Sequence, residues 1–426
     1  MKSLIKRSSQ ESSTMPGLAL YCFSCQKSYD FEMRFTPCNT CSNPLQVKYG
    51  TTIKSSDFNA LAADPTGFGL SRFKDLLPLP SDVDCVSLGE GNTPLIQLPK
   101  LSIETGLEKL WVKNESANPS WSFKDRLNSV NASLAKAYSF PGIIASSTGN
   151  HGASAAAYAA AAGLKSVVLF PDGTPDIYLK QVQAYGGTAV SMDWKERGGL
   201  LARFVNELGW YPSKSSLPAP ISNPFGVEGY KTVAYELALN MRTTEMPEYI
   251  FIPIGSGDDY FGMTQGFSEL FEIGIISRIP TLVACEATGS CPLHEAVVSG
   301  ADSIEQISNP RTHAISISEG IVSNLALDGL RKVGGKTCTV SEAEIREAAI
   351  LLAKSGIVAE SSSCVSTACA VKFAKLNDLP ADTTMVVMLT ATGLRWPTQI
   401  VEIDRASTFK GRGDEFNRLL EASSRI

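Results

Sequence analysis

Residues 142–171 read GIIASSTGNHGASAAAYAAAAGLKSVVLFP. The segment opens with a short apolar run, passes through a small polar loop into an alanine-rich stretch, and closes with a second apolar run rich in valine. Short apolar runs bounded by turn residues predict buried strands, and the alanine-rich stretch between them predicts a helix. A strand, a helix and a second strand in this order are typical of a parallel βαβ unit.

The same alternation continues along the chain. EKLWVKNE alternates like a strand ahead of the helix-like RLNSVNASLAKAY, and IYLKQVQAYG, TAVSMD, EYIFIPIGSG, YFGMTQGFSELFEIG, TLVACEA and TMVVMLTATG follow downstream. Apolar strands that alternate with amphipathic helices predict mainly parallel sheets covered by helices on both faces. We therefore expect an α/β fold that binds its ligands outside the carboxyl ends of the strands.

The bulk composition excludes several classes of protein. The 426 residues are long enough for at least two domains, and 43% hydrophobic residues with a net charge of -5 indicate a soluble globular chain. Without a basic block or an apolar run of roughly 18–20 residues, we expect no nucleic-acid partner and no membrane span. The N-terminal MKSLIKRSSQESSTM has no apolar core, so we expect a disordered tail over residues 1–18, no secretory signal and a cytoplasmic location.

Four of the ten cysteines lie close together near the N-terminus. Cys22 and Cys25 form one C-x2-C pair, and Cys38 and Cys41 form a second pair after twelve intervening residues. Two such pairs joined by short strands predict a zinc ribbon over residues 19–50, whose four thiolates leave no open position on the metal. Any zinc here would be structural, and the alternative is a small cysteine-rich module without metal.

Two loops at expected strand ends could carry chemistry. SFKDR, residues 122–126, places Lys124 at a strand-to-helix junction, where it is either an ordinary surface lysine or a buried reactive amine. SSTGN, residues 146–150, opens a helix, so its backbone N–H groups suit a carboxylate or phosphate. Simple capping of the helix by serine or threonine is the alternative for this second loop.

Two further loops follow later strands. PIGSGDDYFG, residues 253–262, is a glycine-rich turn ahead of a helix and suits a phosphate, although it is not the G-x-G-x-x-G pattern of dinucleotide binding. Its aspartates Asp258 and Asp259 would repel a phosphate unless their side chains turn away, and they could instead be N-caps. LTATGLRWP, residues 389–397, places Thr390 at the end of a strand.

Together and in this order, the motifs resemble those of fold-type II pyridoxal-phosphate enzymes, and most of all the threonine synthase branch. The segments that carry this resemblance are NPSWSFKDR, SSTGN, NPFGVEGYKT, GSGDD, LTATGLRWP and LGEGNTPLIQLP. The resemblance extends from about residue 20 to residue 400 and includes the two-knuckle ribbon. It implies a tryptophan-synthase-β-like, two-domain, parallel-sheet fold and a homodimer.

The resemblance also implies a division of the chain. A large cofactor domain would take residues 51–128 and 240–405, a small mobile α/β domain would take residues 129–239 and close over the substrate, and residues 406–426 would form a tail. The ribbon would pack beside the large domain.

The resemblance implies a role for each matching residue. Lys124 would form the Schiff base with pyridoxal phosphate and move the substrate's α-proton, while Asn150 would bond the cofactor's 3-hydroxyl group. Thr390 would face the ring nitrogen, and a hydroxyl partner there suits elimination and replacement better than transamination. The cofactor phosphate would lie on Gly255, Ser256, Gly257, Asp258 and Asp259. The substrate carboxylate would lie on Ser146, Ser147, Thr148, Gly149 and Asn150.

Four positions depart from the family pattern. Gly226 replaces an arginine, His151 a small hydroxyl residue, Trp121 a glycine and Asp259 an asparagine. Losing an arginine removes a bidentate contact to phosphate, and gaining an aspartate adds repulsion. His151 is a candidate acid, base or leaving-group contact, or it merely packs. Trp121 either stacks over the substrate or fills the pocket.

The resemblance implies a lyase or transferase of amino-acid metabolism that depends on pyridoxal phosphate (PLP). The departures predict that its small amino-acid substrate is not O-phosphohomoserine. A genuine threonine synthase, a cysteate-synthase-like β-replacement enzyme, an ammonia-lyase and a non-catalytic protein that kept the fold are the alternatives. Two smaller expectations concern neighbouring residues. Asp125 and Arg126 are expected to pair with each other locally, and Cys364 is expected to pack rather than react.

Overall fold

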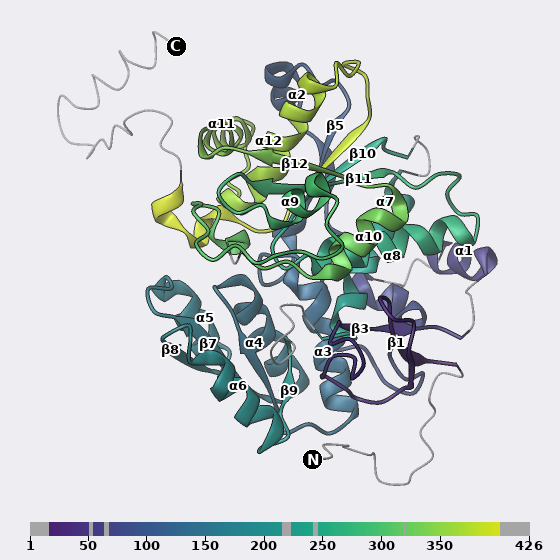
Figure 1. The fold of residues 1–426 in the computed structure, drawn as a ribbon, viewed down its shortest axis with the longest axis vertical. Coiled ribbons are helices and arrows are strands. Elements are labelled where there is room, and N and C mark those ends of the chain that lie inside the picture. Colours follow the sequence, from purple (N-terminus) through teal and green to yellow (C-terminus); the bar gives the residue numbers. More distant parts are fainter. Residues whose placement is uncertain are drawn as a thin grey trace, which may run out of the picture.

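The protein folds around three β-sheets, shown in a computed structural model that describes residues 17–50, 54–63, 68–214, 223–241, 246–318 and 320–400 (Figure 1). The tails expected at residues 1–18 and 406–426 lie outside the described residues, except for Gly17 and Leu18. None of the described helices is long and apolar enough to cross a membrane.

The largest sheet has six strands in the order β12-β11-β10-β13-β5-β4. Its strands are parallel except for the edge strand β4, which runs antiparallel to β5. The strand bounds are β4 Leu95–Gln97, β5 Leu110–Asn114, β10 Tyr249–Pro253, β11 Thr281–Ala287, β12 Lys336–Val340 and β13 Met385–Leu389.

A second sheet has four parallel strands in the order β8-β7-β6-β9. Its strands are β6 Gly142–Ser146, β7 Lys165–Pro171, β8 Thr188–Met192 and β9 Tyr211–Pro212. In Figure 1 this sheet and its helices lie at the lower left, apart from the larger sheet above. The two parallel sheets confirm the predicted α/β class.

Twelve α-helices are described. Their bounds are α1 Ser55–Ala63, α2 Pro99–Thr105, α3 Lys124–Ala137, α4 Asn150–Ala162, α5 Asp176–Ala184, α6 Arg197–Asn206, α7 Lys231–Asn240, α8 Asp258–Glu272, α9 Pro292–Ser299, α10 Asn324–Val333, α11 Glu342–Lys354 and α12 Ser361–Leu376. Short 3-10 helices span Gly69–Leu76, Glu115–Ala117, Gly226–Tyr230, Ile315–Ile317, Gly393–Arg395 and Pro397–Gln399.

Apolar side chains cover both faces of the six-stranded sheet. On one face, Ile250 and Leu282 pack in a cluster with side chains of α7, α8 and α10. On the other face, Phe251 and Val283 pack in a cluster with side chains of α11 and α12. This burial on both faces explains why the strand sequences are continuously apolar rather than alternating.

The alanine-rich helix α4 lies close to the four-stranded sheet. A Cβ atom at Gly152 would come within 2.4 Å of Val168 Cγ1, so only glycine permits this approach. Most of the alanines of α4 are buried, and their small side chains let the helix pack between the sheet and α3. The close packing brings the first turn of α4 to the carboxyl end of β6.

The ribbon module, residues 19–50, contains a three-stranded antiparallel sheet in the order β2-β1-β3. Its strands are β1 Ala19–Cys22, β2 Ser28–Asp30 and β3 Leu45–Lys48. Phe35 packs edge-on against Tyr211 of the four-stranded sheet, with ring centroids 4.9 Å apart. Phe23 packs in a cluster with side chains of α8 and α10, so the module contacts both larger parts of the molecule.

The expected domain boundaries fall at helices. The boundary between residues 128 and 129 lies inside α3, and the boundary between residues 239 and 240 lies at the last residue of α7. The division into a large and a small mobile domain at these residues stays a prediction.

Candidate active site

A cavity lies where the ends of the two parallel sheets meet. Its walls come from the loops after β6, β10 and β13, from the start of α3, and from segments near residues 214, 316 and 360. The lining residues are Phe123, Lys124, Ser146, Ser147, Thr148, Asn150, His151, Lys214, Pro253, Gly255, Ser256, Asp258, Asp259, Ser316, Ile317, Glu360, Ser362 and Thr390.

Lys124 begins α3 and points into this cavity. The preceding loop is held against the end of β13, because Ser122 bridges Ala391 and the Phe123 N–H donates to the Thr390 carbonyl at 2.9 Å. The Lys124 Nζ lies 4.1 Å from the centroid of the Phe123 ring and 5.7 Å from that of Tyr230. The amine is therefore half-buried and lies beside aromatic rings, where it can reach a molecule in the cavity.

Asn150, the first residue of α4, is held from both sides of its amide. Its Nδ2 donates to the Glu360 carboxylate at 2.9 Å, and its Oδ1 accepts from the Arg395 guanidinium. Tyr178 also donates to Oδ1, at 3.3 Å. These partners orient the amide with its N–H groups on the side of the Glu360 carboxylate.

The loop at residues 146–149 wraps the start of α4. The Ser147 hydroxyl accepts from the backbone N–H groups of Gly149 and Gly152, each at 2.9 Å, which caps the helix. A Cβ atom at Gly149 would come within 2.7 Å of the Tyr178 ring, so this position requires glycine. The Ser147 hydroxyl thus caps α4, and Ser146, Ser147 and Thr148 all line the cavity.

The loop at residues 255–259, called the phosphate cradle below, precedes α8. Gly257 has a left-handed φ of 86°, and a Cβ atom there would come within 2.6 Å of Ala326 Cβ. Asp258 accepts from the Ser256 hydroxyl at 2.9 Å, and Asp259 accepts from the Tyr260 backbone N–H at 2.9 Å. Both carboxylates have local partners, yet both line the cavity.

Burial changes the acidity of several groups at the site. Burial raises the pKa of Asp259 to about 6, against the opposing effect of Lys124. Burial also raises the pKa of Glu360, which Asn150 and Arg395 partly offset. The pKa of His151 lies well below its ordinary value, because the ring is buried and Lys124 and Lys214 lie nearby.

His151 is therefore a neutral imidazole. Its Nε2 lies 3.0 Å from the Ser213 hydroxyl, which itself donates to Asn128 Oδ1 at 2.6 Å. A hydroxyl has one proton to donate, so this network assigns the His151 proton to Nε2 and leaves Nδ1 as an acceptor.

At the end of β13, the Thr390 hydroxyl lies 2.8 Å from the Ser363 hydroxyl at the start of α12. The Ala391 N–H donates to the same Ser363 hydroxyl at 2.9 Å. The Thr390 side chain is thereby fixed at the cavity wall. Nearby in α12, Cys364 is fully buried and burial raises its pKa to about 12, so this thiol packs in the core as expected.

Three predicted site residues do not line the cavity: Gly149, Gly257 and Trp121. The two glycines shape their loops, because Gly149 lies close to the Tyr178 ring and Gly257 lies close to Ala326. Trp121 has a left-handed φ of 63° and a ring that is half exposed, 5.8 Å from the Arg395 guanidinium. Its expected contact with substrate stays a prediction.

The expected pairing of Asp125 with Arg126 is wrong. Arg126 instead binds Glu115 and Glu236, with N–O distances of 2.7 Å to each carboxylate, in a fully buried network. Asp125 accepts from Ser120 and Ser154, and burial raises its pKa to about 6. A buried guanidinium needs compensation on several sides, which one neighbouring aspartate does not provide.

Sequence reasoning did not single out several residues of the site. Glu360, Ser316 and Lys214 line the cavity, and the buried Arg395 lies behind Asn150. Arg395 lies in the LTATGLRWP segment, which matches a family motif. Glu360 lies directly before the serine-rich start of α12. Ser316 and Lys214 follow no motif.

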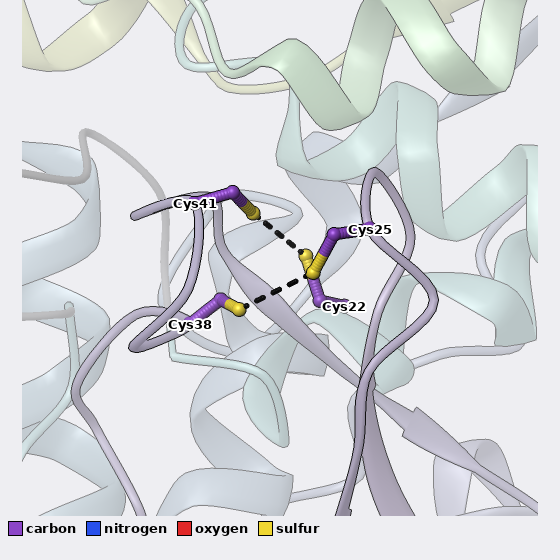
Figure 2. A group of neighbouring side chains, drawn as sticks. All are labelled: Cys22, Cys25, Cys38 and Cys41. Atoms are coloured by element: carbon purple, nitrogen blue, oxygen red, sulfur yellow. Dashed lines mark hydrogen bonds between the residues drawn. The ribbon is translucent and has the colours of Figure 1, made fainter.

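The four N-terminal cysteines form a separate cluster far from this cavity in sequence. Their sulfur atoms all lie within 4.8 Å of one another, and Figure 2 shows them pointing inward from the two knuckles. Cys22 and Cys41 sulfurs are 3.3 Å apart, and Cys25 and Cys38 sulfurs are 3.5 Å apart. This arrangement can bind a zinc ion, as the spacing predicted.

The cavity residues fit the cofactor that the resemblance implies. An amine, a glycine-containing turn ahead of a helix and a hydroxyl lie on one cavity, at Lys124, the phosphate cradle and Thr390. A Cβ atom at Gly255 would come within 3.2 Å of the Ser316 carbonyl, so glycine keeps the turn open there. The aspartates are the one unfavourable feature, because Asp259, with a pKa raised to about 6, still carries negative charge at neutral pH.

Comparisons with known proteins identify the family of the chain. A family model described as "Pyridoxal-phosphate dependent enzyme" matches residues 86–391. The threonine synthase of Methanocaldococcus jannaschii is 32% identical over 382 residues, which are 88% of this chain and 92% of that protein. The threonine synthase of Synechocystis sp. is 32% identical over 338 residues, covering 78% and 84%.

Among solved structures, maize serine racemase has a TM-score of 0.63 at 17% identity, covering 88% of this chain and 99% of that chain. The processed form of threonine deaminase isoform 2 from Solanum lycopersicum has a TM-score of 0.61 at 19% identity, covering 77% and 87%. Such identities support the fold alone, and they confirm the fold-type II prediction. The chain therefore belongs to the fold-type II pyridoxal-phosphate-dependent enzymes of amino-acid metabolism, in the family that includes the threonine synthases.

Proposed function

We propose that this enzyme eliminates or replaces a group at Cβ or Cγ of a small L-amino acid whose side chain has no phosphate. The proposal rests on one observation above the others: the space that an arginine side chain would need at position 226 is filled. The relatives named threonine synthase make a phosphorylated substrate the main alternative.

Gly226 lies against the side chain of Asn131. A Cβ atom at Gly226 would come within 2.5 Å of Asn131 Oδ1, and Asn131 cannot easily move aside. Its amide is held by the Ser213 hydroxyl at 3.1 Å, the Asn223 amide at 3.0 Å and the Tyr211 hydroxyl at 3.1 Å. This position therefore provides neither a cation nor room for one.

The charges of the residues that line the cavity also disfavour a phosphate on the substrate. Among the described lining residues, Lys124 and Lys214 are cationic, whereas Asp258, Asp259 and Glu360 are acidic. Lys124 would be engaged by the cofactor, whose own phosphate adds negative charge. A second phosphate on the substrate would then face a negative surface, which is unfavourable in a partly buried site.

His151 suits an uncharged polar side chain. Its neutral ring lines the cavity one residue after Asn150. A neutral imidazole can accept or donate a hydrogen bond without attracting an anion, whereas a substrate phosphate would favour imidazolium. The low pKa of His151 therefore supports a neutral leaving group.

Bound pyridoxal phosphate would supply the electron sink for carbanion chemistry. The chain's own residues supply the rest of the proposed reaction. The Lys124 amine takes the α-proton and returns it, and Asn150 and Thr390 hold the ring in place. Ser146, Thr148 and the N–H groups at the start of α4 orient the substrate carboxylate, because a helix N-terminus favours an anion.

The absorption spectrum of the purified holoenzyme tests this proposal. The cofactor band should change on adding L-serine, L-threonine or another unphosphorylated amino acid, with release of ammonia or a 2-oxo acid. O-phospho-L-homoserine should leave the band unchanged and release no phosphate. A Lys124→Ala variant should bind the cofactor without a borohydride-reducible link and should lose activity.

Each other outcome has a definite meaning. Phosphate release from O-phospho-L-homoserine would identify a threonine synthase and refute the proposed substrate class, and a Lys214→Ala variant would then show whether Lys214 binds that phosphate. A band that forms but responds to no member of the panel would favour a non-catalytic protein. O-phospho-L-serine with sulfite would reveal cysteate-synthase-like replacement, which would also contradict the unphosphorylated substrate.

A further inference from the structure

We propose that the four-cysteine cluster is a structural zinc site whose occupancy keeps the phosphate cradle in its binding shape. The inference concerns cofactor binding and does not depend on which substrate the enzyme takes. It joins two parts of the molecule that are distant in sequence through contacts of the ribbon module with α8 and α10.

The cluster has the geometry of a closed four-thiolate site. Zinc bonds of about 2.3 Å in a tetrahedron place sulfur atoms about 3.8 Å apart, and the observed separations of 3.3 Å to at most 4.8 Å bracket this value. Polar groups also approach the sulfurs: the Tyr29 hydroxyl lies 3.1 Å from Cys38 Sγ, and Asn43 Nδ2 lies 3.6 Å from Cys41 Sγ. Such outer contacts orient metal ligands and partly neutralise thiolate charge.

The first knuckle carries an aromatic anchor between its two ligands. Phe23 follows Cys22 directly and packs in a cluster with Val227, Phe261 and Leu325. These three residues belong to the 3-10 helix Gly226–Tyr230, to α8 and to α10, respectively. Because Cys22 and Cys25 hold both ends of the knuckle, the direction of the Phe23 ring depends on how the cysteines are held.

The second knuckle makes a polar contact with α10. Asn43 donates from Nδ2 to Cys41 Sγ and accepts at Oδ1 from Asn324 Nδ2 at 3.3 Å. Asn324 is the first residue of α10. One amide side chain therefore connects a candidate metal ligand to the start of the helix that Phe23 also contacts.

The start of α10 forms the wall behind the phosphate cradle. The Ser323 N–H donates to the Ser256 carbonyl at 3.0 Å, and Ala326 lies so close to Gly257 that no Cβ atom fits between them. The cradle also continues directly into α8, which contributes Phe261 to the cluster. Displacing α8 or α10 would therefore alter the turn whose N–H groups bind phosphate.

The ribbon module is small, and its buried side chains belong to a core cluster that it shares with α3, α4 and the four-stranded sheet. Its sheet has strands of four, three and four residues. Modules of this size usually need a metal or disulfides to fold, and metal binding then contributes directly to their folding free energy. Without zinc we expect the knuckles to loosen, Phe23 to leave its cluster and the cradle to lose its preorganised shape, which weakens phosphate binding.

Zinc content and cofactor affinity, measured together, test the inference. Wild-type holoenzyme should contain one zinc per chain by elemental mass spectrometry. Cys25→Ser should lose zinc, and its dissociation constant for pyridoxal phosphate should rise about tenfold, which corresponds to about 1.4 kcal/mol. Phe23→Ala should keep zinc and show a similar loss of cofactor affinity, because it removes the contact and not the metal.

Ser24→Ala is the matched control, since Ser24 lies in the same knuckle with an exposed side chain, and it should change neither quantity. A wild-type protein without zinc, or a zinc-free Cys25→Ser variant with unchanged cofactor affinity, would overturn the inference. If Cys25→Ser does not fold, Phe23→Ala decides: unchanged affinity with zinc retained would refute the connection between the module and the cradle.

Discussion

If the cofactor phosphate lies on the phosphate cradle, as we propose, Asp259 is the residue whose charge would most directly oppose it. It lines the cavity in the phosphate cradle, and burial raises its pKa to about 6. We predict that Asp259→Asn binds pyridoxal phosphate more tightly than wild type at pH 8, by roughly 5- to 30-fold, since a partly screened charge contact of about 1–2 kcal/mol is removed. Titration of the apo protein with cofactor measures this effect.

The pH dependence of stability provides the check on Asp259. Its folded-state pKa of about 6 lies above the unfolded value of 3.8, so its contribution to stability is present below about pH 4 and is lost as pH rises through 6. The apo Asp259→Asn variant should therefore be more stable than wild type at pH 8 and lose this advantage near pH 4. Denaturant titrations with equal differences at both pH values would contradict the predicted protonation.

Single residues also show what a sequence can and cannot predict. Lys124, Asn150 and Thr390 stood in motifs at the ends of expected strands, and all three line the cavity. Glu360 was missed because its contact with Asn150 joins residues 210 positions apart and depends on how α4 and α12 are packed. The partners of Arg126 were missed for the same reason, since Glu236 lies 110 residues away.

Among the secondary-structure elements, β5, α3 and α7 are joined by a buried ion network. Lys113 and Arg126 both bind Glu236, and Arg126 also binds Glu115. We predict that Arg126→Met lowers the free energy of unfolding by about 3–5 kcal/mol, because it leaves Glu115 buried without its guanidinium partner. Chemical denaturation at pH 7 measures this loss.

Arg203→Met is the control for the Arg126 substitution. Arg203 pairs with Glu207 at 3.1 Å on the exposed face of α6, and removing such a pair should cost less than about 1 kcal/mol. If the two variants lose similar amounts of unfolding free energy, then burial does not make the Arg126 ion pairs more important for stability than the exposed pair.

The 3-10 helix Gly226–Tyr230 packs closely against α3, where Gly226 lies beside Asn131. Gly226→Ala forces a methyl group against Asn131 and should destabilise the protein by about 1–3 kcal/mol. Adding Asn131→Ala should recover part of the loss, so a double-mutant cycle should give a favourable coupling energy. Additive losses in denaturant titrations would mean that the two side chains do not compete for space, which would weaken the argument against a substrate phosphate.

In the whole molecule, the cavity takes its walls from both parallel sheets, so ligand binding should draw them together. Residues 146–151 follow the four-stranded sheet, and residues 255–259 follow the six-stranded sheet. We predict that the amino acid that changes the cofactor band slows amide hydrogen exchange in both segments, as closure over a substrate requires. The strands of the ribbon module serve as an internal reference, and protection confined to residues 255–259 would argue against closure.

The family resemblance also predicts a homodimer. Light scattering coupled to gel filtration should give twice the chain mass of 45.6 kDa. A monomeric mass with full cofactor occupancy would show that the cavity is complete within one chain.

The packing of Phe23 also affects the order in which the protein can assemble during synthesis. Phe23 leaves the ribosome about 300 residues before Leu325, an interval of roughly 15–60 s at 5–20 residues per second. During that interval α10 has not been synthesised, so the Phe23 ring cannot yet pack against Leu325. The contact of Phe23 with α10 therefore forms late in synthesis, so a metal ion has time to bind the four cysteines before this contact is made.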